Sequence, residues 1–143
     1  MALKYLLDTN ILSEPLKADP DPSVMERIEQ HQTDVSTAAP VWHELQYGRF
    51  RLPRSKKRNT IERYLQDIIL PNIPIFAYDE AAAAWHALQR AMLSQRGRAP
   101  SFVDGQIAAI AHVNDLIMVT RNTADFAEFE DLTVEFWHTT VVE

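Results

Sequence analysis

Short apolar segments alternate along the chain with longer segments in which apolar residues recur at helical spacing. The short segments predict β-strands over residues 3–7, 34–37, 73–77, 116–120 and 134–137. The longer segments predict helices over 24–31, from Pro40 through Gly48, over 61–69 with Pro71 as the stop, from 80 through 92 after Asp79, and from 102 to about 113 after Ser101. Because strands separated by helices pair in parallel, the pattern predicts an α/β fold. We expect a parallel sheet of about five strands, sandwiched by helices.

The composition is that of one folded domain covering residues 1–143. Of the 143 residues, 46% are hydrophobic and 24% are charged, which suits a single hydrophobic core. The absence of cysteine excludes disulfides, thiol catalysis and cysteine-bound metal centres. No apolar run approaches the roughly 20 residues that span a bilayer, and the first residues show no secretory signal pattern. We therefore expect a cytoplasmic protein without a membrane partner.

The positive charge is concentrated in one stretch, although the formal net charge of the chain is −6. Seven of the 14 Lys and Arg residues lie between residues 49 and 63. Such a local cluster can contact phosphates even in an acidic protein. It can equally be a solvated helix face. The candidate RNA-binding residues are Arg49, Arg51, Arg54, Lys56, Lys57 and Arg58.

Four acidic residues fall where the predicted fold would bring them together. Asp8 directly follows the first strand, and Asp125 lies shortly after the fourth. Asp104 stands in the first turn of a helix that runs back along the sheet, and Glu44 is predicted on the apolar side of its helix. In open parallel sheets, ligands bind at the carboxyl ends of the strands. The four carboxylates are therefore predicted to meet at that edge.

Each acid also has an ordinary structural explanation, as a turn residue, a helix cap or half of an ion pair. Those explanations do not account for the convergence, because four like charges in one place repel one another unless a cation lies between them. Oxygen ligands favour Mg²⁺ or Mn²⁺. The pattern therefore indicates a divalent metal site.

Four short motifs surround these acids. In chain order they are Leu6-Leu7-Asp8-Thr9-Asn10, His43-Glu44-Leu45, Phe102-Val103-Asp104-Gly105-Gln106-Ile107-Ala108, and Thr120-Arg121-Asn122 followed by Asp125-Phe126. Their order and spacing over essentially the whole chain resemble a PIN domain of the VapC type. This type includes the FitB-like toxins of bacterial toxin–antitoxin pairs.

The resemblance implies a Mg²⁺-dependent endoribonuclease, with Mn²⁺ as an alternative metal, that hydrolyses RNA phosphodiester bonds. It also implies a homodimer that a cognate antitoxin protein neutralises. The residues that match the family's metal-binding and catalytic acids are Asp8, Glu44, Asp104 and Asp125. The residues that match polar groups orienting the carboxylates or the attacking water are Thr9 and Asn122.

A second hypothesis assigns no catalysis to the chain. An α/β module that binds nucleic acid or protein would show the same fold and the same basic stretch, and its acidic pocket would be vestigial. Metal-dependent cleavage of RNA separates the two hypotheses, since nothing else in the sequence offers a group that could activate water.

Overall fold

Five short strands form one parallel sheet in a computed structural model, which describes residues 2–140. The strands are β1 (Tyr5–Leu7), β2 (Val35–Ala38), β3 (Ile75–Phe76), β4 (Ile117–Val119) and β5 (Val134–Glu135). Their order in the sheet is β3-β2-β1-β4-β5, and every neighbouring pair is parallel. The predicted α/β fold and the five strands are confirmed.

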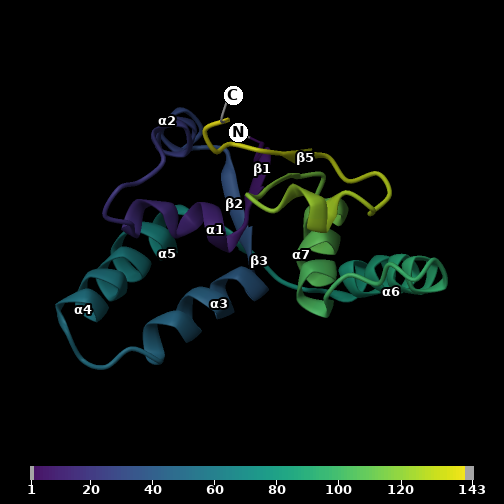
Figure 1. Ribbon diagram of the computed structural model, residues 1–143, viewed down its shortest axis with the longest axis horizontal. Coiled ribbons are helices and arrows are strands. Elements are labelled where there is room, and N and C mark those ends of the chain that lie inside the picture. The colour runs from purple at the N-terminus through teal and green to yellow at the C-terminus, as the bar shows by residue number, and fades with distance from the viewer. Residues whose placement is uncertain (1, 141–143) are drawn as a thin grey trace.

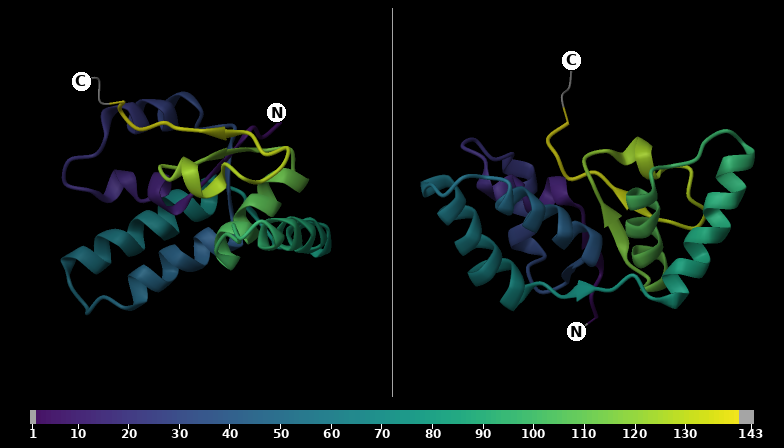
Figure 2. Two further views of the ribbon diagram at one scale, coloured as in Figure 1. Left: turned by 45° about the vertical axis from the view of Figure 1, so that its right-hand side comes forward. Right: turned by 90° about the horizontal axis from the view of Figure 1, so that it is seen from below.

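The helices lie on both sides of the central strands. Figure 1 shows α1, α3, α4 and α5 on one side of β1 and β2, with α6 and α7 on the other. The main helices are α2 (Pro22–Gln30), α3 (Ala39–Phe50), α4 (Lys56–Arg63), α6 (Glu80–Gln95) and α7 (Phe102–Val113). Both views of Figure 2 show α6 alongside α7, and its left view shows α3 and α4 as a projecting hairpin.

The sequence pattern missed a helical segment directly after β1. The helix α1 (Thr9–Leu12) begins at Asp8, whose carboxylate caps it, and a 3₁₀ turn, η1 (Glu14–Leu16), follows. One turn of helix is too short to show helical periodicity. Asp8 therefore both directly follows a strand and caps a helix.

The prediction that Pro71 ends its helix was wrong by one residue. After α4 the chain makes a π-helical turn, η2 (Tyr64–Ile69), and then a short helix, α5 (Leu70–Asn72), that contains Pro71. A proline is tolerated in the first turn of a helix, where its missing N–H needs no partner. The change to π-helical hydrogen bonding before Leu70 creates such a first turn.

The apolar residues build one core around β1 and α7. All three residues of β1 are buried, as is the run from Ile107 to Ala111 in α7. This packing fixes the first turn of α7 relative to the end of β1. In the part of the chain that the structure describes, no helix is both long and apolar enough to cross a membrane.

Candidate active site

The buried carboxylate of Asp8 lies at the carboxyl end of β1. Its exposed fraction is only 8%. Oδ1 accepts a 2.8 Å hydrogen bond from the Thr9 N–H, and Oδ2 accepts one of 2.8 Å from the Thr120 hydroxyl. Burial raises the pKa of Asp8, and the charges of Asp104 and Asp125 raise it further. Ionisation of Asp8 in this place thus has an energetic cost.

Asp104 and Asp125 stand together beside it. Asp104 lies in the first turn of α7, where Ser101 caps the helix by accepting the Asp104 N–H. Asp125 lies in η3 (Thr123–Phe126), the 3₁₀ turn after β4. Both line an open pocket of about 350 Å³. Burial and the charge of Asp125 raise the pKa of Asp104. Three of the four predicted acids therefore repel one another across this edge of the sheet.

Glu44 differs from its predicted position. Its side chain is exposed, although its neighbour Leu45 in α3 is buried. The prediction that it faces the apolar side of the helix was wrong, because one helical step of about 100° separates it from the buried row. Glu44 starts from the correct edge, since α3 follows β2 without a break. Its role as a metal ligand stays a prediction.

The Thr120 side chain orients Asp8 through its hydroxyl group. Its Oγ1 also accepts hydrogen bonds from the Asn10 side chain at 3.3 Å and from the Asn122 N–H at 3.1 Å. Thr9 and Asn122, the two predicted supporting residues, contribute to this network through backbone N–H groups. The sequence does contain a signal for Thr120, because this polar residue directly follows the apolar strand β4.

The donor set at this edge suits Mg²⁺ or Mn²⁺, which prefer carboxylate oxygens. A cation would also relieve the repulsion that raises the pKa values of Asp8 and Asp104. Among residues 2–140, no three Asp, Glu or His side chains already stand close enough to enclose a metal ion. Mg²⁺ keeps several waters and often needs only one or two carboxylates besides substrate phosphates. Asp8 with Asp104 or Asp125 fits that requirement.

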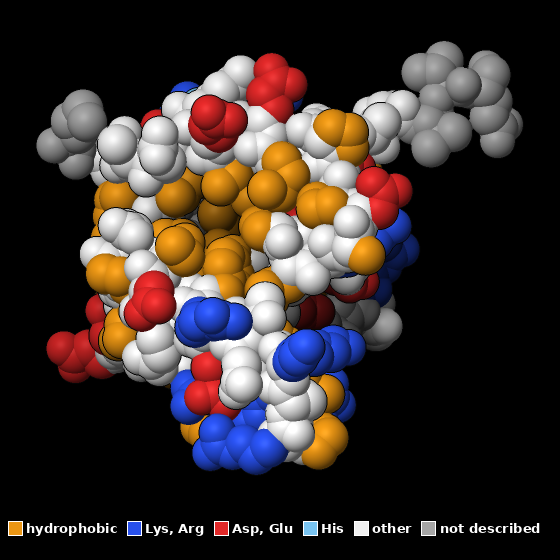
Figure 3. Space-filling model, turned by 90° about the vertical axis from the view of Figure 1, so that its left-hand side faces the viewer, with side chains coloured by type: hydrophobic (Ala, Val, Ile, Leu, Met, Phe, Trp, Pro, Cys, Tyr) orange, Lys and Arg blue, Asp and Glu red, His pale blue; other side chains and the backbone are white. Residues whose placement is uncertain are grey.

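The basic stretch forms the tip of the α3–α4 hairpin, where Lys and Arg side chains gather in Figure 3. Three of its arginines converge on one carboxylate. Glu62 lies 2.8 Å from Arg58 Nε and 3.4 Å from the nearest nitrogens of Arg49 and Arg54. The hydrogen bond from Arg58 lowers the pKa of Glu62. Half of the predicted RNA-binding residues thus hold the hairpin together, which sequence alone did not indicate.

The other three candidate RNA-binding residues lie outside this cluster. The Arg51 guanidinium lies 5.2 Å from the centre of the Tyr47 ring. Lys56 and Lys57 are exposed at the start of α4, and neither forms an ion pair within residues 2–140. These two lysines are the part of the stretch most available to a phosphate.

Comparison with known proteins decides the family. Residues 5–132 match the PIN domain. The chain belongs to the PIN domain family. This PIN domain is 34% identical to Toxin FitB of Neisseria gonorrhoeae, over 93% of this chain and 98% of that protein. It is 35% identical to the tRNA(fMet)-specific endonuclease VapC of Shigella flexneri, over 94% of this chain and 98% of that protein.

Solved structures of toxin–antitoxin complexes share the fold of this PIN domain. One is FitAB bound to an IR36 DNA fragment, with a TM-score of 0.86, 31% identity and full coverage (100%) of both chains. Another is VapBC2 from Rickettsia felis bound to a promoter DNA fragment. It has a TM-score of 0.80 and 27% identity, over 96% of this chain and 99% of that chain. The resemblance to VapC-type and FitB-like PIN domains is therefore confirmed.

Proposed function

We propose that this PIN domain is a Mg²⁺-dependent endoribonuclease and the toxin of a toxin–antitoxin pair. The observation that carries the proposal is the buried carboxylate of Asp8, at the carboxyl end of a parallel strand and within electrostatic range of Asp104 and Asp125. Relatives named as an endonuclease and a ribonuclease, at 35% and 30% identity, support it.

In the proposed mechanism, Asp8 and Asp104 are the principal metal ligands, and Glu44 and Asp125 complete the acidic set. Each Asp8 oxygen accepts one hydrogen bond and so keeps a lone pair for a ligand. The Thr120 hydroxyl holds that carboxylate in position. These acidic residues would hold Mg²⁺, which would supply Lewis-acid catalysis and would lower the pKa of a coordinated water.

Purified protein, free of antitoxin, should cleave RNA with Mg²⁺ or Mn²⁺, and EDTA should stop the cleavage. Transfer RNA is the first substrate to test, because one relative is named a tRNA(fMet)-specific endonuclease. Metal catalysis supplies several kcal/mol of transition-state stabilisation, so removal of the metal should slow cleavage at least about 100-fold. Gel analysis of end-labelled RNA measures it. Cleavage that continues at the same rate in EDTA contradicts the mechanism.

One observation favours the second hypothesis, a binding module without catalysis. Within residues 2–140 the acids do not form a ready-made cage for a metal, and Glu44 is exposed. A binding module would leave every tested RNA intact at all Mg²⁺ concentrations while still retaining it in a metal-free binding assay. The same experiment therefore separates the two functions.

The proposed partners are a cognate antitoxin and a second copy of the chain. The antitoxin is supported by the similar structures, which are complexes named FitAB and VapBC. Figure 3 also shows a hollowed hydrophobic area above the α3–α4 hairpin. Large apolar side chains about half exposed on α3, η2 and α5 add to the apolar surface that a protein partner would cover: Tyr47, Phe50, Ile68 and Leu70.

The basic stretch is proposed to bind RNA mainly through Lys56 and Lys57. Replacing both with Gln should weaken metal-free RNA binding and reduce the log–log salt slope by about 1.4, which is roughly 0.7 for each lost phosphate contact with single-stranded RNA. Fluorescence anisotropy at several salt concentrations measures the slope. The control is Lys4→Gln, since Lys4 precedes β1 at the opposite edge of the sheet. An unchanged slope in the double variant would assign the stretch to a solvated surface.

A further inference from the structure

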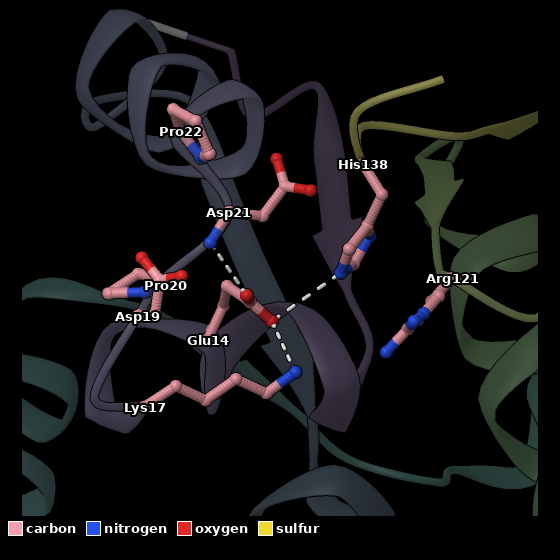
Figure 4. A pocket seen from close by; sticks show the side chains of 8 residues that line it. All are labelled: Glu14, Lys17, Asp19, Pro20, Asp21, Pro22, Arg121 and His138. Carbon is pink, nitrogen blue, oxygen red and sulfur yellow. Dashed lines mark hydrogen bonds and ion pairs between the residues drawn. The ribbon is translucent and has the colours of Figure 1, made fainter. Parts of the chain in front are cut away.

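A second pocket, with a volume of about 290 Å³, is shown in Figure 4. Its walls come from the segments that leave three neighbouring strands. Glu14 and Lys17 follow β1 and α1, Arg121 follows β4, and His138 follows β5. Since β1, β4 and β5 are adjacent and parallel, these segments emerge at the same sheet edge as Asp8. Arg121 is also the direct neighbour of Thr120, which holds Asp8.

Nitrogen-bearing side chains surround a single buried carboxylate in this pocket. The Lys17 Nζ lies 3.0 Å from Glu14 Oε2, and the His138 Nε2 lies 3.4 Å from the same oxygen. Figure 4 shows Arg121 reaching toward this pair from the other wall. The Arg121 side chain has no ion pair or hydrogen bond within residues 2–140. Its charge therefore remains available to a ligand.

Glu14 acts as a fixed anchor for these groups. Its exposed fraction is 2%, and Oε1 accepts a 2.8 Å hydrogen bond from the Asp21 N–H. Burial raises the pKa of Glu14, but the hydrogen bonds from Asp21 and Lys17 more than offset this, so the pKa lies below its ordinary value. Glu14 is therefore ionised at neutral pH, and its charge balances that of Lys17.

His138 supplies an independent sign of a missing ligand. It is 92% buried, because its exposed fraction is 8%, and it lines the pocket. Its Nε2 faces the Glu14 carboxylate at 3.4 Å, whereas its Nδ1 has no hydrogen-bond partner within residues 2–140. Buried polar atoms are usually paired, and an imidazole always carries at least one N–H donor. A contact of 3.4 Å is long for a hydrogen bond, so an acceptor in the pocket would give the His138 N–H a closer partner.

The remaining acidic residues of the pocket are Asp19 and Asp21, and their negative charges reduce its attraction for an anion. The Asp21 carboxylate accepts hydrogen bonds from the N–H groups of Ser23 and Val24 and from the N–H and hydroxyl of Thr139. It is therefore occupied by the start of α2 and by the C-terminal segment. Asp19 lies at the end of the pocket away from Arg121 in Figure 4.

We propose that the pocket formed by Lys17, Arg121 and His138 binds a phosphate group of the RNA strand, next to the phosphodiester that is cleaved. The inference rests on the proposed ribonuclease function. RNA is favoured over free phosphate because the segments that carry Asp8 and Thr120 also build this pocket, so one strand crossing the sheet edge meets both sites. Arg121 and His138 donate hydrogen bonds to the phosphate oxygens, and Lys17 adds charge.

The test measures metal-free binding of a fluorescent single-stranded RNA to the full chain at several salt concentrations. Arg121→Gln should reduce the log–log salt slope by about 0.7 and weaken binding about five-fold at 0.1 M salt, while Arg121→Lys should keep most of the slope. The matched control is Arg27→Gln, because Arg27 is an exposed arginine of α2 that does not line the pocket. Both Gln variants should melt like the wild type.

Further measurements distinguish an RNA phosphate from a free phosphate ion as the ligand. They also distinguish failure of the phosphate subsite from failure of the proposed ribonuclease function. Equal slopes for wild type and Arg121→Gln would overturn the subsite. A titration in which inorganic phosphate shifts the His138 imidazole NMR signals while the RNA slopes stay equal would also overturn it, in favour of a free-anion site. EDTA-sensitive cleavage by the wild type tests the ribonuclease function separately. With Mg²⁺ present, Arg121→Gln should raise KM for RNA with little change in kcat, since it removes binding and not chemistry.

Discussion

Replacing Gly105 with alanine is expected to destabilise the protein by about 1–3 kcal/mol, the usual cost of overpacking a core. A Cβ atom at this position would lie 2.6 Å from His86 Cδ2 and closer still to His86 Nε2. The imidazole cannot easily move aside, because Tyr78 Oη lies 2.8 Å from its Nδ1 and the ring packs on Phe102. Thermal unfolding should show a decrease in Tm of roughly 3–9 °C. Cleavage should also fall, since the displaced turn carries Asp104.

Two comparisons isolate the contact between α6 and α7. Gly48 lies inside α3 with nothing within 4 Å of an added Cβ, so Gly48→Ala should stabilise the protein by up to about 1 kcal/mol through helix propensity alone. In a His86→Ala background the obstacle is absent, so adding Gly105→Ala should cost little. The double-mutant cycle should give a coupling of at least about 1 kcal/mol. Equal costs of Gly105→Ala in both backgrounds would show that the close approach does not exist in solution.

Replacing Asp8 with asparagine is expected to abolish cleavage and, in metal-free protein, to increase stability. The loss of a principal metal ligand should lower the cleavage rate by at least about 100-fold. Asparagine still caps α1, since it accepts the Thr9 N–H as aspartate does, while the buried charge is removed. The expected gain in the free energy of unfolding at pH 7 is about 0.5–2 kcal/mol, measured by thermal melting in EDTA.

The gain should depend on pH in a defined direction. Burial raises the pKa of Asp8 above its ordinary value of 3.8. A carboxyl group with a raised folded-state pKa contributes its full stability below 3.8 and loses it as pH rises through the folded-state value. The advantage of Asp8→Asn should therefore be largest near neutral pH and shrink as pH falls toward 3.8. Asp21 behaves in the opposite way, because its hydrogen bonds hold its pKa at about 2. The contribution of Asp21 to the free energy of unfolding is the same in the wild type and in Asp8→Asn, so it cancels when the two are compared.

Metal should reverse the order of stability. Mg²⁺ binds the folded wild type and stabilises it through linkage, while the variant gains little. The result that contradicts the assignment is a lower metal-free Tm for Asp8→Asn together with retained cleavage. That outcome would mean that Asp8 is a structural cap and not a metal ligand.

The fold could be predicted from the sequence because its signals are local. Alternating apolar strands and amphipathic helices identify a parallel α/β sheet. In such a sheet, a residue after one strand shares an edge with a residue after the next, so Asp8 and Asp125 could be placed together without coordinates. The helix caps at Ser101 and Asp79 were also predicted, since each cap is specified within four residues.

The position of Glu44 and the short helix α1 could not be predicted. Helical spacing indicates that Glu44 lies within about 100° of the buried row of its helix. It does not determine whether a residue at that position is buried or exposed. A single helical turn leaves no periodic pattern at all. Both outcomes depend on which elements pack on α1 and α3, and these contacts join residues far apart in the chain.

By itself, the sequence determined the class of fold, the sheet edge that carries the acids and the order of the motifs. Only the tertiary structure decided which charges are free and which are paired. Thr120 meets Asp8 across 112 positions of sequence, and His138 meets Glu14 through the sheet order. The sequence shows only a run of basic residues, whereas the structure shows that three of its arginines pair with Glu62. The physical reason is that composition counts charges, while burial and pairing, which set their energies, arise only when distant segments pack.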